Sequence, residues 1–131
     1  MHIIAEVCII FRIVPPSHRH SEEITRHVYD RFLAYIRRYD VVKQPNPHNP
    51  SLRGIYHEPN TGLYLLKKST RANGEWLGDI VPLDQIRAMA DVTPRFGAKA
   101  NRQLTCSSSM AYSAEFWLNK YFDKQLFYAL S

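Results

Sequence analysis

The chain has 131 residues, of which 45% are hydrophobic and 22% are charged, and its formal net charge is +5. This length suits one domain and leaves no room for a second. The balance of hydrophobic and charged residues is that of an ordinary folded protein, which excludes an intrinsically disordered chain. We therefore expect a single domain over residues 1–131.

The N-terminal residues 1–14 are rich in isoleucine and valine. They predict a strand buried on both faces, or an internal segment that has lost its usual neighbour. Glu6 interrupts the apolar run and no Lys or Arg precedes it, which is not typical of a targeting segment. Cys8 and Cys106 match no metal or redox spacing. We expect an intracellular protein with reduced thiols and no membrane contact.

Residues 22–39 are predicted to form an amphipathic helix. Ser21 is the predicted N-cap, and Glu22 and Glu23 follow it where the helix dipole favours negative charge. Apolar side chains then recur largely at spacings of three and four, which is the period of one helical face. They are Ile24, Val28, Phe32, Leu33 and Ile36.

The middle of the chain predicts extended structure. Three prolines at near-alternate positions in residues 44–51 exclude a helix and indicate a loop. Residues 53–81 predict a three-stranded antiparallel β-meander on which the helix can pack. Asn73-Gly74 is the strongest turn signal in it.

The C-terminal part predicts two further helices. A short helix is expected over residues 83–90, and a helical segment over residues 109–130, with Asp123 as a point where it can break. The predicted fold class is therefore α+β. It consists of a small antiparallel sheet of three to four strands, with an N-terminal amphipathic helix and a C-terminal aromatic helix packed on it.

Two stretches without acidic residues supply the candidate nucleic-acid-binding residues. They are residues 59–74 and 92–114, and they form a basic patch if they face the same side. The alternative is that their charges are solvated loop residues that keep the protein soluble. The six candidates are Lys67, Lys68, Arg71, Arg95, Lys99 and Arg102.

Aromatic residues near the C-terminus are a second candidate site. Because Lys120 and Lys124 alternate with them, they could stack on unpaired bases. Aromatic residues at helical spacing more often form core, and an aromatic surface can also complete the core of a partner. The residues concerned are Phe116, Trp117, Tyr121, Phe122 and Phe127.

No catalytic or metal site is predicted. The histidines lack the paired spacing of zinc sites, and Cys106 has neither a glycine elbow nor a following histidine. Asp79, Asp84 and Asp91 suit strand, cap and turn positions better than a two-metal nuclease. We expect no enzymatic activity, no cofactor, no metal and no small-molecule substrate.

Residues 60–130 resemble a known family. The segment Pro94-Arg-Phe-Gly97, the block Glu115-Phe-Trp-Leu-Asn-Lys-Tyr-Phe-Asp-Lys124 and the closing Leu126-Phe-Tyr-Ala-Leu130 resemble the C-terminal region of proteins encoded by fungal Plavaka-type DNA transposons, relatives of CACTA elements. The resemblance implies a non-catalytic region that follows a zinc finger and a nuclease core. The chain would then be a truncated remnant or an accessory module of a DNA transposon protein.

Two function classes follow from these patterns. The first is a nucleic-acid-associated module that contacts phosphates non-specifically through its basic loops, which makes the nucleus the candidate compartment. The alternative is a protein-interaction or self-association module that uses the aromatic C-terminus. The expected partners are DNA, a second copy of the chain or a transposon-encoded protein.

Overall fold

The computed structural model describes residues 2–14, 31–98 and 100–130, which form two compact units. Unit 1 contains the described residues of 1–4, 39–69 and 88–131, and unit 2 contains those of 5–38 and 70–87. Strand β2 (Leu33–Val41) contributes residues 33–38 to unit 2 and residues 39–41 to unit 1. The described residues are 45% strand and 12% helix, so the fold is mostly β and the predicted α+β class is wrong.

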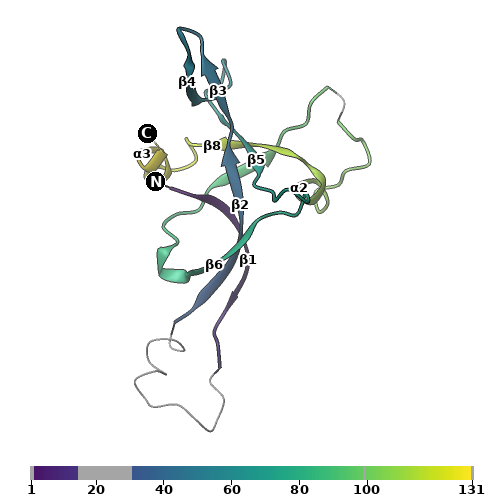
Figure 1. Cartoon of the computed structure of the whole chain (residues 1–131). Coiled ribbons are helices and arrows are strands. Elements are labelled where there is room, and N and C mark those ends of the chain that lie inside the picture. Colours follow the sequence, from purple (N-terminus) through teal and green to yellow (C-terminus); the bar gives the residue numbers. More distant parts are fainter. Residues whose placement is uncertain (1, 15–30, 99, 131) are drawn as a thin grey trace. The chain divides into compact units, whose positions relative to one another are not determined.

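Unit 1 is built on an antiparallel sheet with the strand order β2-β5-β8-β7 (Figure 1). The strands that join β2 are β5 (Tyr64–Lys68), β8 (Glu115–Asn119) and β7 (Asp91–Pro94). The register places Leu66 opposite Phe116 and Tyr64 opposite Leu118. Directly opposite residues share one face of a sheet. All four side chains are buried, so this face carries the core of unit 1.

Two short helices form hydrogen bonds with residues of that core face. They are α2 (Ser109–Tyr112) and α3 (Lys124–Leu130). The Lys68 ammonium donates a hydrogen bond to the carbonyl of Ala111 in α2, at 2.6 Å. The Tyr64 hydroxyl donates one to the carbonyl of Leu130 in α3, at 3.3 Å, and Leu126 of α3 is buried. The helices therefore cover one face of the sheet. On the other face Leu65 is buried, whereas Lys67 and Glu115 are exposed.

The predicted C-terminal helix over residues 109–130 is wrong, because strand β8 separates α2 from α3. Residues 115–119 alternate between buried and less buried positions, and Phe116 and Leu118 are the buried ones. That alternation has the period of a strand. Asp123 directly precedes α3, and its carboxylate accepts a hydrogen bond from the Gln125 backbone N–H in the first turn of that helix.

Strands β3 (Lys43–Asn46) and β4 (Asn49–Ile55) form a separate two-stranded antiparallel hairpin in unit 1 (Figure 1). It takes up most of the stretch predicted as an extended loop. The prolines of this stretch fit because a two-stranded hairpin has outward edges where no backbone donor is needed. The turn is closed by the Asn46 side chain, which accepts a hydrogen bond from the backbone N–H of His48.

Strands β1 (Ile4–Phe11) and β6 (Gly78–Pro82) pair with β2, and apart from Ile4 their residues belong to unit 2. The pairing of β2 with β6 is antiparallel and brings Ile36 opposite Asp79. Ala34 and Ile36 are buried, and Arg38, two residues further along β2, forms an ion pair with Asp79 at 2.9 Å. The Trp76 indole donates a hydrogen bond to the Arg38 carbonyl, at 2.6 Å.

The predicted N-terminal helix is wrong where the structure describes it. Residues 22–30 of the prediction lie outside the described residues, and residues 33–39 belong to strand β2. The buried residues Ile36 and Tyr39 of β2 are three positions apart, which imitates helical spacing. Ile36 belongs to unit 2 and Tyr39 to unit 1, so the two residues serve different cores.

The predicted meander also differs from the structure. Strands β5 and β6 each pair with β2 and not with one another within the described residues. Asn73-Gly74 does form a turn, with Gly74 at a φ of 86° and a bridge between Thr70 and Trp76. The expected helix over residues 83–90 is reduced to a single 3-10 turn, η1 (Leu83–Gln85).

Strand β1 falls within the stretch predicted as a strand, but it is not buried on both faces. Only Ile4 is buried, whereas Val7, Ile9 and Ile10 are exposed. An apolar run therefore does not identify a buried strand by itself, because it cannot show whether a second layer covers it.

Candidate nucleic-acid interface

A row of four charged side chains crosses the second face of the unit 1 sheet. Asp40 of β2 lies opposite Lys67 of β5, and Lys67 lies opposite Glu115 of β8. Arg95 follows β7 and donates its backbone N–H to the Glu115 carbonyl, at 2.9 Å. Its guanidinium forms an ion pair with the Glu115 carboxylate at 2.7 Å. The row alternates in sign, so the stretches that lack acids in the sequence do not lack them in space.

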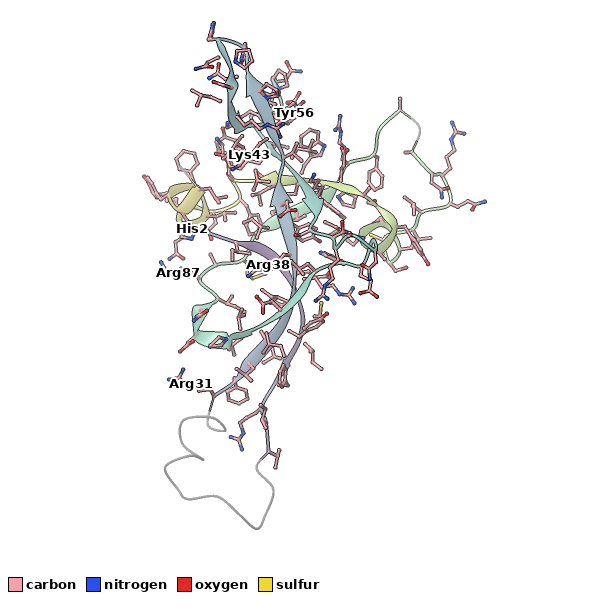
Figure 2. The ribbon with its side chains drawn as sticks, viewed as in Figure 1. His2, Arg31, Arg38, Lys43, Tyr56 and Arg87 are labelled. Atoms are coloured by element: carbon pink, nitrogen blue, oxygen red, sulfur yellow. The ribbon has the colours of Figure 1, made fainter. Side chains whose placement is uncertain are left out.

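Trp117 lies two residues beyond Glu115 on the same strand face, and it is half-buried. The Arg95 guanidinium lies over its ring, 5.1 Å from the centroid. The ring of Tyr56, which follows β4 and is labelled in Figure 2, stacks beside it with centroids 6.4 Å apart. We call Tyr56, Trp117, Arg95 and Lys67 the aromatic-cationic face.

The six predicted phosphate-binding residues are not brought together as one patch. Lys67 and Arg95 share the aromatic-cationic face, whereas Lys68 points to the core face and contacts the Phe116 ring and α2. Arg102 is exposed in a loop of unit 1, and Arg71 belongs to unit 2. Lys99 lies outside the described residues.

The five predicted aromatic residues separate into different environments. Phe116 is fully buried, with 0% exposure, and packs edge-on against Tyr39 at 5.1 Å between centroids. Trp117 and Phe127 are half-buried. Tyr121 and Phe122 are exposed, and Phe122 keeps 54% of its accessible surface. The core prediction therefore holds for Phe116, while Tyr121 and Phe122 remain available to a partner.

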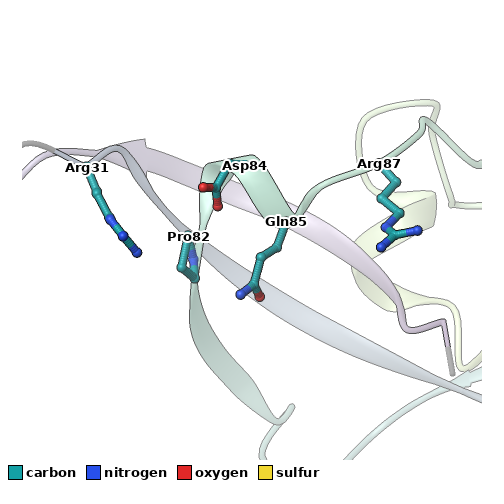
Figure 3. Close-up of a pocket in the computed structure, with 5 residues that line it drawn as sticks. All are labelled: Arg31, Pro82, Asp84, Gln85 and Arg87. Atoms are coloured by element: carbon teal, nitrogen blue, oxygen red, sulfur yellow. The ribbon is translucent and has the colours of Figure 1, made fainter.

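Acidic and sulfur-containing residues do not gather into a metal site in the described part of the chain. Asp79 accepts hydrogen bonds from Arg38 and from the Ile80 backbone, and Asp91 accepts one from Asn119. Asp84 lines a hollow of about 550 Å³ in unit 2, together with Arg31, Pro82, Gln85 and Arg87 (Figure 3). These three aspartates thus hold separate structural positions.

Glu58 lies in the loop that leads into β5, where its carboxylate accepts hydrogen bonds from Thr61. Hydrogen bonds from the Thr61 side chain and backbone hold the pKa of the Glu58 carboxyl below its ordinary value. Gly62 follows at a φ of 70°, a conformation that suits glycine. The acid thus orders the turn that places Tyr64 at the start of β5.

The sequence analysis did not identify three residues of the charged and aromatic surface, namely Asp40, Tyr56 and Glu115. Asp40 and Glu115 lie outside the acid-free stretches, and Tyr56 lies far along the chain from Trp117. Their proximity depends on the pairing of β2, β5 and β8, which are distant in sequence. The alternation of residues 115–119, with Glu115, Trp117 and Asn119 on one side, is the sequence signal that could have identified this face.

Comparison with known proteins gives one family similarity. Residues 1–57 are similar to a family described as a domain of unknown function, DUF6830. This match covers strands β1 to β4 and ends before the aromatic-cationic face is complete. No curated protein and no solved structure matches the chain. Among the described residues, no helix is long and apolar enough to cross a membrane.

Proposed function

We propose that the protein is a nucleic-acid-associated module that binds single strands weakly and without sequence preference through the aromatic-cationic face. The observation that supports it is the half-buried Trp117 with the exposed Arg95 over its ring and the exposed Lys67 in the adjacent charged row. Single-strand binders combine aromatic stacking with basic side chains in this way. The resemblance of residues 60–130 to Plavaka-type proteins makes transposon DNA, in the nucleus, the proposed context.

The mechanism requires the Arg95 guanidinium to exchange its ion-pair partner Glu115 for a phosphate of the nucleic acid. Its ion pair with Glu115 lies at the surface, with 40% and 47% of the two side chains exposed. Exposed ion pairs contribute only about 0–1 kcal/mol. A phosphate can therefore draw the guanidinium away from Glu115, and an unpaired base can stack on the ring of Trp117 that the guanidinium uncovers. In this proposal the protein supplies binding and no catalysis.

The test is a titration of the protein with labelled oligothymidylate at several salt concentrations. Trp117→Ala is expected to weaken binding by roughly 5- to 150-fold, the equivalent of one stacked base. Lys67→Ala with Arg95→Ala is expected to lower the slope of log affinity against log salt by about 1.4, because two phosphate contacts are lost. Glu115→Gln is expected to tighten binding, since it removes the competing carboxylate.

The control variant is Lys124→Ala, which removes the same charge from α3 on the covered side of the sheet. It is expected to change the slope little, and Trp117→Phe is expected to retain most of the affinity because the ring face is kept. If Lys124→Ala lowers the slope by about 0.7, half the change of the double variant, the binding reflects net charge alone. That result, or no binding by the parent at low salt, would contradict the proposed interface.

A second candidate function is the docking of a partner protein on the aromatic C-terminus. Tyr121, Phe127 and Tyr128 form a cluster in unit 1, with Tyr121 and Phe127 stacked at 5.8 Å and Phe127 edge-on to Tyr128 at 5.7 Å. Tyr128 keeps 75% of its accessible surface. Exposed aromatic clusters of this kind are typical of protein-interaction sites.

A further inference from the structure

Strand β1 is an end strand of its sheet and presents apolar side chains to solvent. It pairs with β2, and no other strand of the described residues pairs with it. The exposed fractions of Ile9 and Ile10 are 57% and 53%. Val7 and Cys8 are exposed as well. An edge strand of this kind offers unpaired backbone donors and acceptors to another strand.

Natural edge strands are usually protected by lysine, proline or inward-facing charge, and β1 has little of this protection. From Ile4 to Phe11 its sole charged residue is Glu6, and the next charge is Arg12, directly after the strand. Both side chains are exposed, and neither has an ion-pair partner in the part of the chain that the structure describes.

The positions of these two charges make the strand complementary to itself. Glu6 and Arg12 lie three residues before and three residues after Ile9. Because they are six residues apart, they share one strand face with each other, opposite to that of Ile9. If two copies of β1 pair antiparallel with their Ile9 residues opposite one another, Glu6 of each copy lies opposite Arg12 of the other. Val7 then lies opposite Phe11. Registers that are not centred on Ile9 do not bring the two charges opposite each other.

We propose that β1 pairs with β1 of a second copy of this chain, antiparallel and about a two-fold axis at Ile9. The pairing joins the two unit 2 sheets edge to edge and forms two Glu6–Arg12 pairs by symmetry. It also brings Ile9 against Ile9 and Val7 against Phe11, which removes apolar surface from water. The proposal goes beyond nucleic-acid binding, because it uses unit 2 and shares no residue with the aromatic-cationic face.

Charge exchange tests the register. In the Glu6→Arg variant the new arginine of each copy faces Arg12 of the other copy, so two pairs of like charges form. Self-association is therefore expected to weaken by roughly tenfold or more. Arg12→Glu is expected to weaken it similarly, because two acidic side chains then face each other. A mixture of the two single variants is expected to form the heterodimer, since every opposed pair then has opposite signs. The measurement is sedimentation velocity of the full chain over a wide concentration range.

A disulfide trap tests the position of the axis. In a background with Cys8→Ser and Cys106→Ser, Ile9→Cys places two thiols opposite each other, within the separation that a disulfide spans. Mild oxidation is expected to give a covalent dimer. The matched control is Ile13→Cys, because Ile13 is also exposed and apolar but lies four residues from the axis, too far from its symmetry mate for a disulfide.

The outcomes separate this proposal from the alternatives. Recovery of association in the mixed variants, together with a covalent dimer for Ile9→Cys and not for Ile13→Cys, supports the pairing. A parent that sediments as a monomer at every concentration overturns it and leaves the edge to a strand of another protein. A parent dimer that both charge variants leave unchanged also overturns it. If the parent protein forms the dimer but does not bind nucleic acid, the proposed function is contradicted and the dimer proposal stands.

Discussion

Replacing Phe116 with alanine is expected to lower the free energy of unfolding by about 3–5 kcal/mol, which is a large part of the stability of a small domain. The Phe116 ring has no exposed surface and lies opposite Leu66 and Pro94 in the centre of the unit 1 sheet. It also receives the edge contact of Tyr39 and the Lys68 ammonium at 5.7 Å from its centroid. Truncation leaves a cavity that three strands cannot close by small shifts.

The control for this variant is Phe122→Ala. Phe122 is also aromatic and lies near Phe116 in the sequence, but it is exposed, so its removal is expected to change the unfolding free energy by about 0.5 kcal/mol or less. Urea melts followed by circular dichroism measure both variants. Equal midpoints for Phe116→Ala and Phe122→Ala would show that β8 does not carry the core of unit 1.

The C-terminal segment shows what the sequence could and could not predict. Phe116 was correctly included among the candidate core residues, because a large aromatic side chain has a high prior of burial. Its secondary structure was predicted wrongly, since Trp117 and Tyr121 are four residues apart and match a helical face as well as any strand. Pairing of β8 with β5 and β7 decides in favour of the strand, and such long-range pairing is not visible in local periodicity.

The candidate interface was predicted in part for a similar reason. Lys67 and Arg95 were identified as basic residues in acid-free stretches, and they do lie on one face of the sheet. Glu115 lies between them through the pairing of β5, β8 and the end of β7, which the sequence does not reveal. Lys68 was expected to act with Lys67, yet neighbouring residues of a strand point to opposite faces. A charge count along the chain therefore overestimated the basic surface.

The helix prediction for residues 22–39 failed because helical spacing and strand alternation both place residues four positions apart on one face. Phe32 and Ile36 fit one side of a helix, and in a strand residues four positions apart also lie on one side, together with Ala34 between them. In the helical interpretation Phe32 and Ile36 share the buried face. In the structure Phe32 precedes β2 and keeps 54% of its surface exposed, whereas Ile36 is buried together with Ala34.

Ile36→Ala is therefore expected to destabilise unit 2 by about 2–4 kcal/mol, whereas Phe32→Ala is expected to change its stability by about 0.5 kcal/mol or less. Ile36 and Ala34 are the buried apolar side chains of unit 2 among the described residues, so the loss of Ile36 removes a large share of a small core. Its neighbourhood cannot compensate, because Asp79 lies opposite it and is held by Arg38.

The two variants are compared by urea denaturation, with Trp76 fluorescence as the probe of unit 2, in a Trp117→Phe background that removes the signal of the second tryptophan. A lower midpoint for Ile36→Ala alone agrees with the strand. Equal destabilisation by both substitutions would place Phe32 and Ile36 on one buried face, as a helix over residues 22–39 requires. A helix over residues 22–39 requires Phe32 to be buried beside Ile36, whereas in the structure Phe32 precedes β2 and is exposed, so this side chain distinguishes the two structures.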